Sequence, residues 1–330
     1  MPLPPILRAR LRLPVVAAPM FIVSGPDLVI AQCKAGIVGS FPALNARPQE
    51  ALAQWLDRIE SELAEHDRAH PEAPSAPYAV NIVLRHGNER LEQDLDVIVK
   101  HKVPIVITSM GARTEVNDVV HSYGGIVLHD VINDTFARKA IEKGADGLIA
   151  VAAGAGGHGG VQSPFALVQE IRRWFDGALV LAGSIARGDS IVAALAMGAD
   201  LAYIGSAFIA TDEANASQAY KQMTIDCSAQ DIVYTSYFTG VHANFLMPSV
   251  AASGIHPDSL RMLECNPSEP GNDRPQRPKA WSEIWGAGQG VGAVHGIQPA
   301  AQFVERLNVE YKRRLAEMAA LARLESIGPT

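Results

Sequence analysis

The chain has 330 residues, of which 48% are hydrophobic and 19% charged, and its net charge is -7. These values are ordinary for a soluble globular enzyme, and the acidic balance without a Lys/Arg cluster argues against nucleic acid as a partner. No apolar run approaches the ~20 residues of a membrane span. Cys33, Cys227 and Cys265 are far apart and match no metal spacing, so we expect no metal site, free thiols and a cytoplasmic location.

Short apolar runs alternate with helical patterns from residue 14 to about residue 215. The predicted strands are Pro14–Ala18, Ile37–Phe41, Ala79–Val83, Ile105–Thr108, Ile126–His129, Gly147–Val151, Leu179–Ala182 and Leu201–Ile204. Predicted helices between them include Pro26–Lys34, Gln49–Glu65, Asn133–Glu142, Pro164–Phe175 and Asp189–Met197. Eight such units in about 200 residues favour a (β/α)₈ TIM barrel, with a doubly wound sheet as the alternative.

The chain changes character after a predicted barrel at residues 1–215. Residues 216–292 contain the aromatic-polar run IVYTSYFTGVHANFLMPS and the stretch NPSEPGNDRPQRPKAW, whose prolines predict an extended surface loop. We expect this region to form a lid, with Tyr234–Asn244 and Trp285–Gln289 covering the site. Residues 293–330 are predicted to close the barrel with an amphipathic helix from Pro299 to about Leu324. Its apolar face, expected to pack on the barrel, carries Phe303, Leu307, Tyr311, Leu315 and Met318.

A glycine-rich run, VAAGAGGHGG at residues 151–160, follows the sixth predicted strand and contains His158. Glycine lets main chain approach a ligand closely, and histidine transfers protons near neutral pH, so His158 is a candidate catalytic residue. The alternative is a flexible loop with an incidental histidine. The run also spells G-x-G-x-x-G at Gly154, Gly156 and Gly159, but its mid-chain position argues against a Rossmann NAD site.

Glycine and serine follow the last two predicted strands, as Gly183-Ser184 and Gly205-Ser206. Barrels often bind phosphate after strands 7 and 8, where exposed N–H groups and hydroxyls form an anion nest. The alternative is that both glycines only permit tight turns. A single phosphate site at a barrel mouth suggests a mononucleotide, and FMN is the common redox choice.

Other predicted strand ends carry further candidate ligands of this cofactor. Ala18 and Met20 end strand 1, although Met20 also fits ordinary core packing. Asn81 ends strand 3, where its amide can bond a flavin edge or cap a turn. Ser109 and His129 end strands 4 and 5, and His129 is equally consistent with a structural hydrogen bond.

These motifs together resemble the nitronate monooxygenase family, formerly called 2-nitropropane dioxygenases. The resemblance rests on AAPM at strand 1, Asn81, AGAGGHGG, AGSIARG and YIGSAF, and on the later segment WGAGQ at residues 285–289. It implies FMN in a TIM barrel, with phosphate contacts from the two Gly-Ser pairs and ring contacts near Met20, Asn81 and Gln289. Ala18, Ser109, His129 and Gly157 complete the candidate FMN-binding residues. It also implies His158 as the base and O₂-dependent oxidation of alkyl nitronates to carbonyl compounds and nitrite.

The chain departs from the family pattern at several positions. Many relatives have Lys in place of Asp130, Gly in place of Ser184, an acid in place of Ala152 and Arg near Asn244. The same superfamily includes FMN-dependent NAD(P)H:quinone and enoyl-thioester reductases, which share the barrel and the glycine-histidine loop. These reductases are therefore the alternative function, and a flavin-binding barrel without turnover is a third hypothesis. The sequence leaves open whether the protein is a homodimer.

Overall fold

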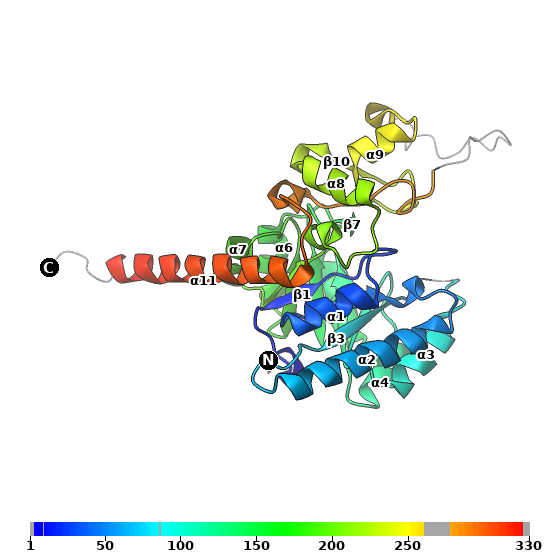
Figure 1. Ribbon diagram of the computed structural model, residues 1–330, viewed down its shortest axis with the longest axis vertical. Helices are drawn as coiled ribbons and strands as arrows, with labels where there is room; N and C mark the ends of the chain where they lie inside the picture. Colours follow the sequence, from blue (N-terminus) through cyan, green and yellow to red (C-terminus); the bar gives the residue numbers. More distant parts are fainter. Residues whose placement is uncertain (1–2, 9, 86, 261–277, 326–330) are drawn as a thin grey trace.

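The computed structural model describes residues 3–8, 10–85, 87–260 and 278–325. Parallel strands form an eight-stranded sheet in the order β1-β9-β8-β6-β5-β4-β3-β2. They are β1 (Val15–Ala17), β2 (Gly39–Pro42), β3 (Tyr78–Val83), β4 (Ile105–Ser109), β5 (Ile126–Val131), β6 (Gly147–Val151), β8 (Ala178–Ala182) and β9 (Leu201–Ile204). The sheet closes where Val16 pairs in parallel with Val38, and the Ala17 N–H donates to the Val38 carbonyl at 2.8 Å. The fold is thus the predicted (β/α)₈ barrel (Figure 1).

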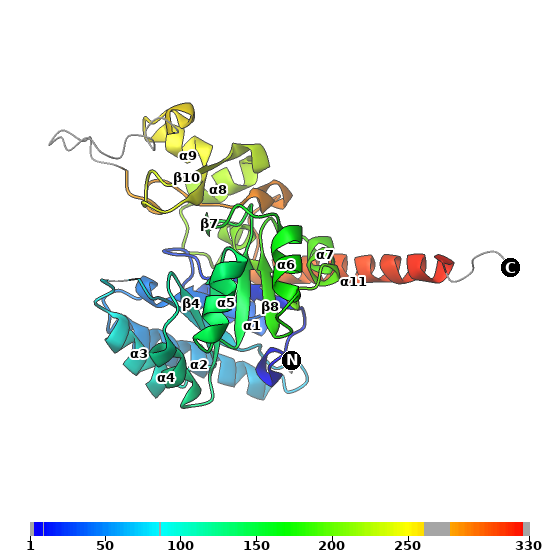
Figure 2. The ribbon, with the colours of Figure 1, turned by 180° about the vertical axis from the view of Figure 1, so that it is seen from behind.

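Helices alternate with the strands and cover the outside of the barrel (Figure 2). They are α1 (Pro26–Lys34), α2 (Ala51–Ala69), α3 (Leu91–Lys100), α4 (Thr114–His121), α5 (Asp134–Glu142), α6 (Pro164–Arg172) and α7 (Gly188–Ala196). Each buries an apolar stripe, as in α2, where Leu52, Leu56, Ile59 and Leu63 recur at helical spacing and are buried. None of the helices in the described ranges is both long and apolar enough to cross a membrane.

The barrel interior is filled by the inward-facing residues of the strands. Ala79, Ile107, Leu128 and Leu201, from four different strands, belong to one buried cluster. Leu7, in the short 3₁₀ helix η1 (Pro5–Leu7), packs into the same cluster. Side chains of a strand alternate between its two faces, so the inward positions are two residues apart along each strand. This layer forms the floor beneath the carboxyl ends of the strands.

A second lobe follows the barrel in the chain and lies beside its carboxyl ends (Figure 1). After β9 the chain passes through η3 (Ser206–Ala210) to α8 (Gln218–Asp226), η4 (Ala229–Asp231), β10 (Ile232–Thr235), β11 (Ala243–Leu246), α9 (Met247–Ala252) and η5 (Pro257–Ser259). β11 pairs antiparallel with β10 and with the two-residue strand β7 (Gly157–His158). Most of the predicted Pro-rich loop, and Cys265, lie outside the described residues.

The last helix, α11 (Ala300–Glu325), packs on the barrel only through its first half. Phe303 and Leu307 are buried, but Leu315 and Met318 are each 41% exposed. The prediction that this whole apolar face packs on the barrel is therefore wrong for the second half. The reason is length, since α11 has 26 residues and the helices α1 and α7 that it contacts have nine each. Figure 1 shows α11 projecting well beyond the barrel.

Candidate active site

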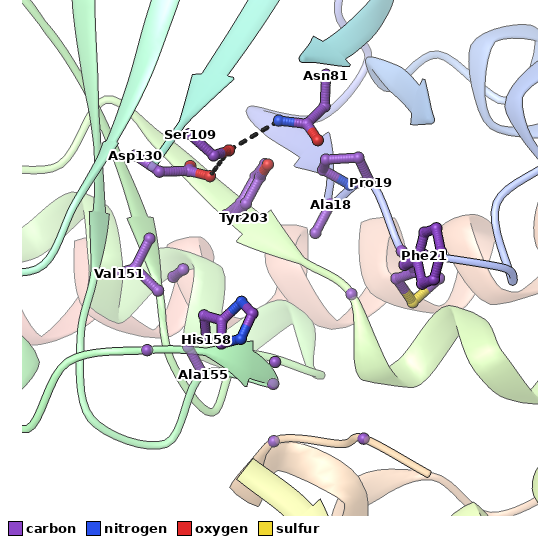
Figure 3. Close-up of a pocket in the computed structure, with 18 of the residues that line it drawn as sticks. Ala18, Pro19, Phe21, Asn81, Ser109, Asp130, Val151, Ala155, His158 and Tyr203 are labelled. Carbon is purple, nitrogen blue, oxygen red and sulfur yellow. Dashed lines mark hydrogen bonds between the residues drawn. The ribbon is translucent and has the colours of Figure 1, made fainter. Parts of the chain in front are cut away.

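A cavity of about 1180 Å³ opens at the carboxyl ends of the barrel strands (Figure 3). Ligands bind at this end of parallel barrels, where the βα loops converge. Every residue that the sequence predicted for catalysis or cofactor binding, Gln289 excepted, lines the cavity: Ala18, Met20, Asn81, Ser109, His129, Gly157, His158, Gly183, Ser184, Gly205 and Ser206. Residues far apart in the sequence therefore meet at one mouth, as expected from their positions after strands.

Gln289 lies at the border of the cavity without lining it. It opens the 3₁₀ helix η6 (Gln289–Ala293), and its N–H donates to the Gly154 carbonyl at 2.9 Å. Its side chain lies against Gly154, where a Cβ on that glycine would be 2.9 Å from Gln289 Oε1. Gly288 and Gly290 on either side do line the cavity. The segment thus borders the cavity through its main chain.

One side of the mouth, which we call the glycine end, consists of Gly154–Gly157, Gly183 and Gly205 with their flanking serines. Side chains at these glycine positions would clash with neighbouring atoms. A Cβ on Gly183, whose φ is +132°, would lie 2.8 Å from the Ala153 carbonyl oxygen. A Cβ on Gly156 would lie 2.8 Å from Ser206 Oγ. Main-chain N–H groups and serine hydroxyls are the donors that bind phosphate oxygens. The residues present therefore fit the phosphate of a mononucleotide.

His158 lies in β7, opposite Ala243 of the second lobe. Its ring meets Trp281 edge-on, with the ring centroids 5.5 Å apart. Burial lowers the pKa of His158 below the ordinary histidine value, and the positive charge of Arg85 lowers it further. The imidazole is therefore neutral at neutral pH and able to accept a proton.

The hydrogen bonds of Thr239 indicate which nitrogen of His158 is basic. His158 Nε2 and Thr239 Oγ1 are 3.2 Å apart. The hydroxyl hydrogen of Thr239 is already donated to the Val241 carbonyl at 2.6 Å, so Oγ1 acts as an acceptor toward the ring. A neutral imidazole carries one N–H, and assigning it to Nε2 from this network leaves the lone pair on Nδ1.

The other side of the mouth, which we call the polar end, is built from side chains on β3, β4 and β5, with Tyr203 of β9 beside them. The Asn81 amide donates to Ser109 Oγ at 2.8 Å, and Ser109 donates to Asp130 Oδ2 at 2.7 Å (Figure 3). Beside them, Thr108 Oγ1 and His129 Nδ1 are 2.6 Å apart. Burial lowers the pKa of His129 to about 4, so this ring is neutral. The same effect raises the pKa of Asp130 to about 6.

Two enclosed polar atoms at the polar end have no hydrogen-bond partner among the described residues. They are Asp130 Oδ1 and the Tyr203 hydroxyl. Buried polar atoms are nearly always paired, so two unpaired ones at the same end of the cavity call for an explanation. The sequence analysis did not assign either residue to the site. The alternation of side chains along a strand could have indicated both residues. Asp130 and Tyr203 lie two positions beyond Leu128 and Leu201 of the barrel floor, so their side chains also point inward.

The second lobe is tied to the glycine-histidine loop by hydrogen bonds. The Asn244 amide donates to the Ala155 carbonyl at 2.6 Å, and the Tyr234 hydroxyl donates to the Gly159 carbonyl at 2.8 Å. The Gly288 N–H donates to Ser206 Oγ at 2.8 Å. Both segments predicted as a lid therefore lie at the carboxyl ends of the strands. Asn244 is buried in this contact, a role that its place in the sequence did not indicate.

The closed barrel and its mouth place the chain among the (β/α)₈-barrel enzymes. A family model described as nitronate monooxygenase matches residues 6–310. The chain is 27% identical to the nitronate monooxygenase of Paraburkholderia phytofirmans, covering 94% of this chain and 95% of that protein. The fold is similar to nitroalkane oxidase from Streptomyces ansochromogenes (TM-score 0.75, 24% identity, 94% and 98% coverage). It is also similar to FabK from Thermotoga maritima (TM-score 0.74, 24% identity, 96% and 97% coverage).

The chain belongs to the nitronate monooxygenase family, and it is an oxidoreductase. The family match covers the barrel, the second lobe and the first part of α11. The resemblance seen in the sequence motifs is thereby confirmed.

Proposed function

We propose that the protein oxidises alkyl nitronates with O₂, giving carbonyl compounds and nitrite, with FMN as its cofactor. The proposal rests mainly on His158, whose imidazole is neutral and bonds Thr239 beside the glycine end. The family to which the chain belongs supports the same reaction. Cys33 and Cys227 are free buried thiols, which fits a cytoplasmic location.

FMN would be held by its phosphate at the glycine end, through Ser184, Ser206 and the main chain at Gly183 and Gly205. Its ring would extend toward the polar end, where the Asn81 side chain offers a polar atom to a flavin edge. When bound, FMN supplies the electron transfer between the substrate and O₂. The second lobe would exclude water from the cavity, because Val241, His242 and Trp281 border it.

His158 would remove the α-proton when the substrate is a neutral nitroalkane. The bond from Nε2 to Thr239 supports Nδ1 as the accepting atom. Burial and Arg85 keep the ring neutral, as a general base requires. With a pre-formed nitronate, which has already lost that proton, His158 would only orient the anion.

The size of the cavity favours one alternative, an FMN-dependent NAD(P)H reductase acting on a quinone or an enoyl thioester. Ligand cavities typically measure about 300–1,000 Å³, and this one is about 1180 Å³. Exposed apolar side chains at its rim, Met110, Ile132 and Phe136, extend it outward. FMN would fill part of this space under either function. A bulky substrate would also use the apolar rim, whereas a small nitroalkane would leave it empty.

Two assays on the purified protein distinguish these functions. The cofactor released on denaturation should be FMN, and aerobic incubation with a nitronate should release nitrite at a rate that saturates with substrate. Anaerobic NADH or NADPH oxidation with added quinone should be slow by comparison. Rapid NAD(P)H oxidation without nitrite release would favour the reductase, and a flavin reduced by neither substrate would indicate a barrel without turnover.

A further inference from the structure

The polar end contains a carboxyl group that is only half satisfied. Asp130 Oδ2 accepts one hydrogen bond, from Ser109, while Oδ1 is enclosed and has no partner among the described residues. The Asn81 side-chain NH₂ donates to Ser109 and to the Ile107 carbonyl. Ser109 in turn donates to Asp130, so the bonds from Asn81 through Ser109 end at the carboxylate (Figure 3). An ionised carboxylate in such a place is costly, because desolvation disfavours the charged form.

No cation contacts Asp130 in the parts of the chain that the structure describes. Arg85 and Lys139 line the same cavity, but both are exposed at its rim. The Tyr203 hydroxyl, which faces the carboxyl from β9, has a pKa well above its ordinary value and stays protonated. His129 is neutral above about pH 4. The pKa of Asp130 itself, about 6, lies just below neutral.

We propose that Asp130 takes up a proton on Oδ1 whenever FMN bound in this cavity is reduced. The inference rests on the proposed function only in requiring FMN in the cavity, with its ring toward the polar end. Two-electron reduction of FMN with uptake of one proton adds a negative charge to the ring. A second negative charge on Asp130 would repel it, so a second proton moves from solvent to the carboxylate. The balance is then two electrons and two protons for each FMN reduced.

The arrangement differs in sign from one with a cation at this position. A lysine would stabilise the reduced, negatively charged flavin at all neutral pH values. Asp130 gives no such stabilisation, and the proton that it takes up makes the potential of the flavin fall twice as steeply with rising pH. Such a flavin gives electrons to O₂ more readily and accepts them from NAD(P)H less readily.

The test is the midpoint potential of bound FMN, measured by reductive titration without nitronate from about pH 5, below the pKa of Asp130, to about pH 8.5. The slope is taken between about pH 6.5 and pH 8.5. Each proton taken up makes the equilibrium tenfold less favourable per pH unit, which is about 30 mV for a two-electron couple. Two protons per flavin predict a slope of about 60 mV per pH unit for the wild type. Asp130→Asn, which carries no charge at any pH, should fall to about 30 mV per pH unit.

Control variants separate Asp130 from its surroundings. Glu142→Gln makes the same charge change on the exposed surface of α5 and should keep the wild-type slope. His158→Asn should also keep it, because the proton is not carried by the imidazole. Ser109→Ala removes the bond that stabilises the carboxylate, so the pKa of Asp130 rises. Below the pKa of Asp130 the carboxyl is already protonated before reduction, so the plot of potential against pH bends there to the one-proton slope. In Ser109→Ala this bend should move to higher pH.

Several results would overturn the inference. A wild-type slope of one proton per flavin, or an unchanged slope in Asp130→Asn, rules out proton uptake by Asp130. If Asp130→Asn binds no FMN, the test is made with Ser109→Ala. A bend at the same pH in Ser109→Ala and in the wild type would contradict the proposal. Absence of nitrite release with an intact two-proton slope would refute nitronate oxidation alone. A wild type that binds no FMN would refute both.

Discussion

The glycine end and the polar end of the cavity meet a ligand by opposite means. At the glycine end main chain approaches closely because Cβ atoms are missing, and adding one at Gly183 brings it 2.8 Å from a carbonyl oxygen. At the polar end Asn81, Ser109 and Asp130 act through their side chains. We therefore expect the glycine end to be sensitive to added side-chain volume and the polar end to changes of charge and hydrogen bonding.

The largest effect should come from His158, the residue that directly follows Gly154–Gly157 of the glycine end. His158→Asn should slow turnover of a neutral nitroalkane by about 10²–10⁴-fold, because general-base catalysis is lost. Oxidation of the pre-formed nitronate should fall far less, and the absorbance of bound FMN should be unchanged. Nitrite release measures both rates, with His256→Asn as a surface control. Equal loss on both substrates would mean that His158 binds or orients the substrate.

Gly183→Val tests whether the glycine end holds the cofactor through its main chain. The new Cβ would lie 2.8 Å from the Ala153 carbonyl oxygen and displace the main chain that we propose holds the phosphate. FMN should therefore bind at least about 100-fold more weakly, or about 2.7 kcal/mol. Gly124→Val is the matched control: its φ is also positive, +87°, but a Cβ there has no neighbour within 4 Å. Fluorescence titration with FMN measures the affinity. Equal losses in both variants would point to backbone strain instead.

A smaller effect is expected where the second lobe joins the glycine end. Asn244→Ala leaves the buried Ala155 carbonyl without its donor, which should cost about 1–3 kcal/mol of stability. Asn215→Ala removes a similar bond, to the Ile22 carbonyl, at an exposed position and should cost under about 0.5 kcal/mol. Urea denaturation followed by fluorescence measures both. Equal costs would show that the contact at Asn244 adds nothing specific.

The smallest effect should be a shift of the pH profile. Since burial and then Arg85 lower the pKa of His158, activity on neutral nitroalkanes should persist below the ordinary histidine pKa and fall at still lower pH, as the ring is protonated. Removing the positive charge in Arg85→Gln raises that pKa, so the fall should begin at higher pH. Lys139→Gln, at the same rim, should leave the profile unchanged. The measurement is kcat/KM against pH, and identical profiles for wild type and Arg85→Gln would exclude this charge effect.

The periodicity of the sequence was sufficient to locate the barrel strands. The ranges Gly147–Val151 and Leu201–Ile204 agree with β6 and β9, because strands buried on both faces appear as short apolar runs between turns. β5 is longer than the predicted Ile126–His129 and ends at Val131, since Asp130 and Val131 still pair with β6. Pairing with a neighbouring strand determines where a strand ends. The apolar run of β5 is interrupted by the polar His129 and Asp130, so the sequence pattern predicts an end that is too early.

The barrel and the family could be predicted from the sequence. The same holds for the position of His158 and of the Gly-Ser pairs at one mouth of the barrel. These follow from local patterns, since a strand, a glycine turn and a helix each depend on neighbouring residues. The tertiary structure alone decided that Asp130 and Tyr203 share an enclosed corner and that Leu315 and Met318 are uncovered. Both depend on the distance between segments far apart in the chain, which no local pattern of residues records.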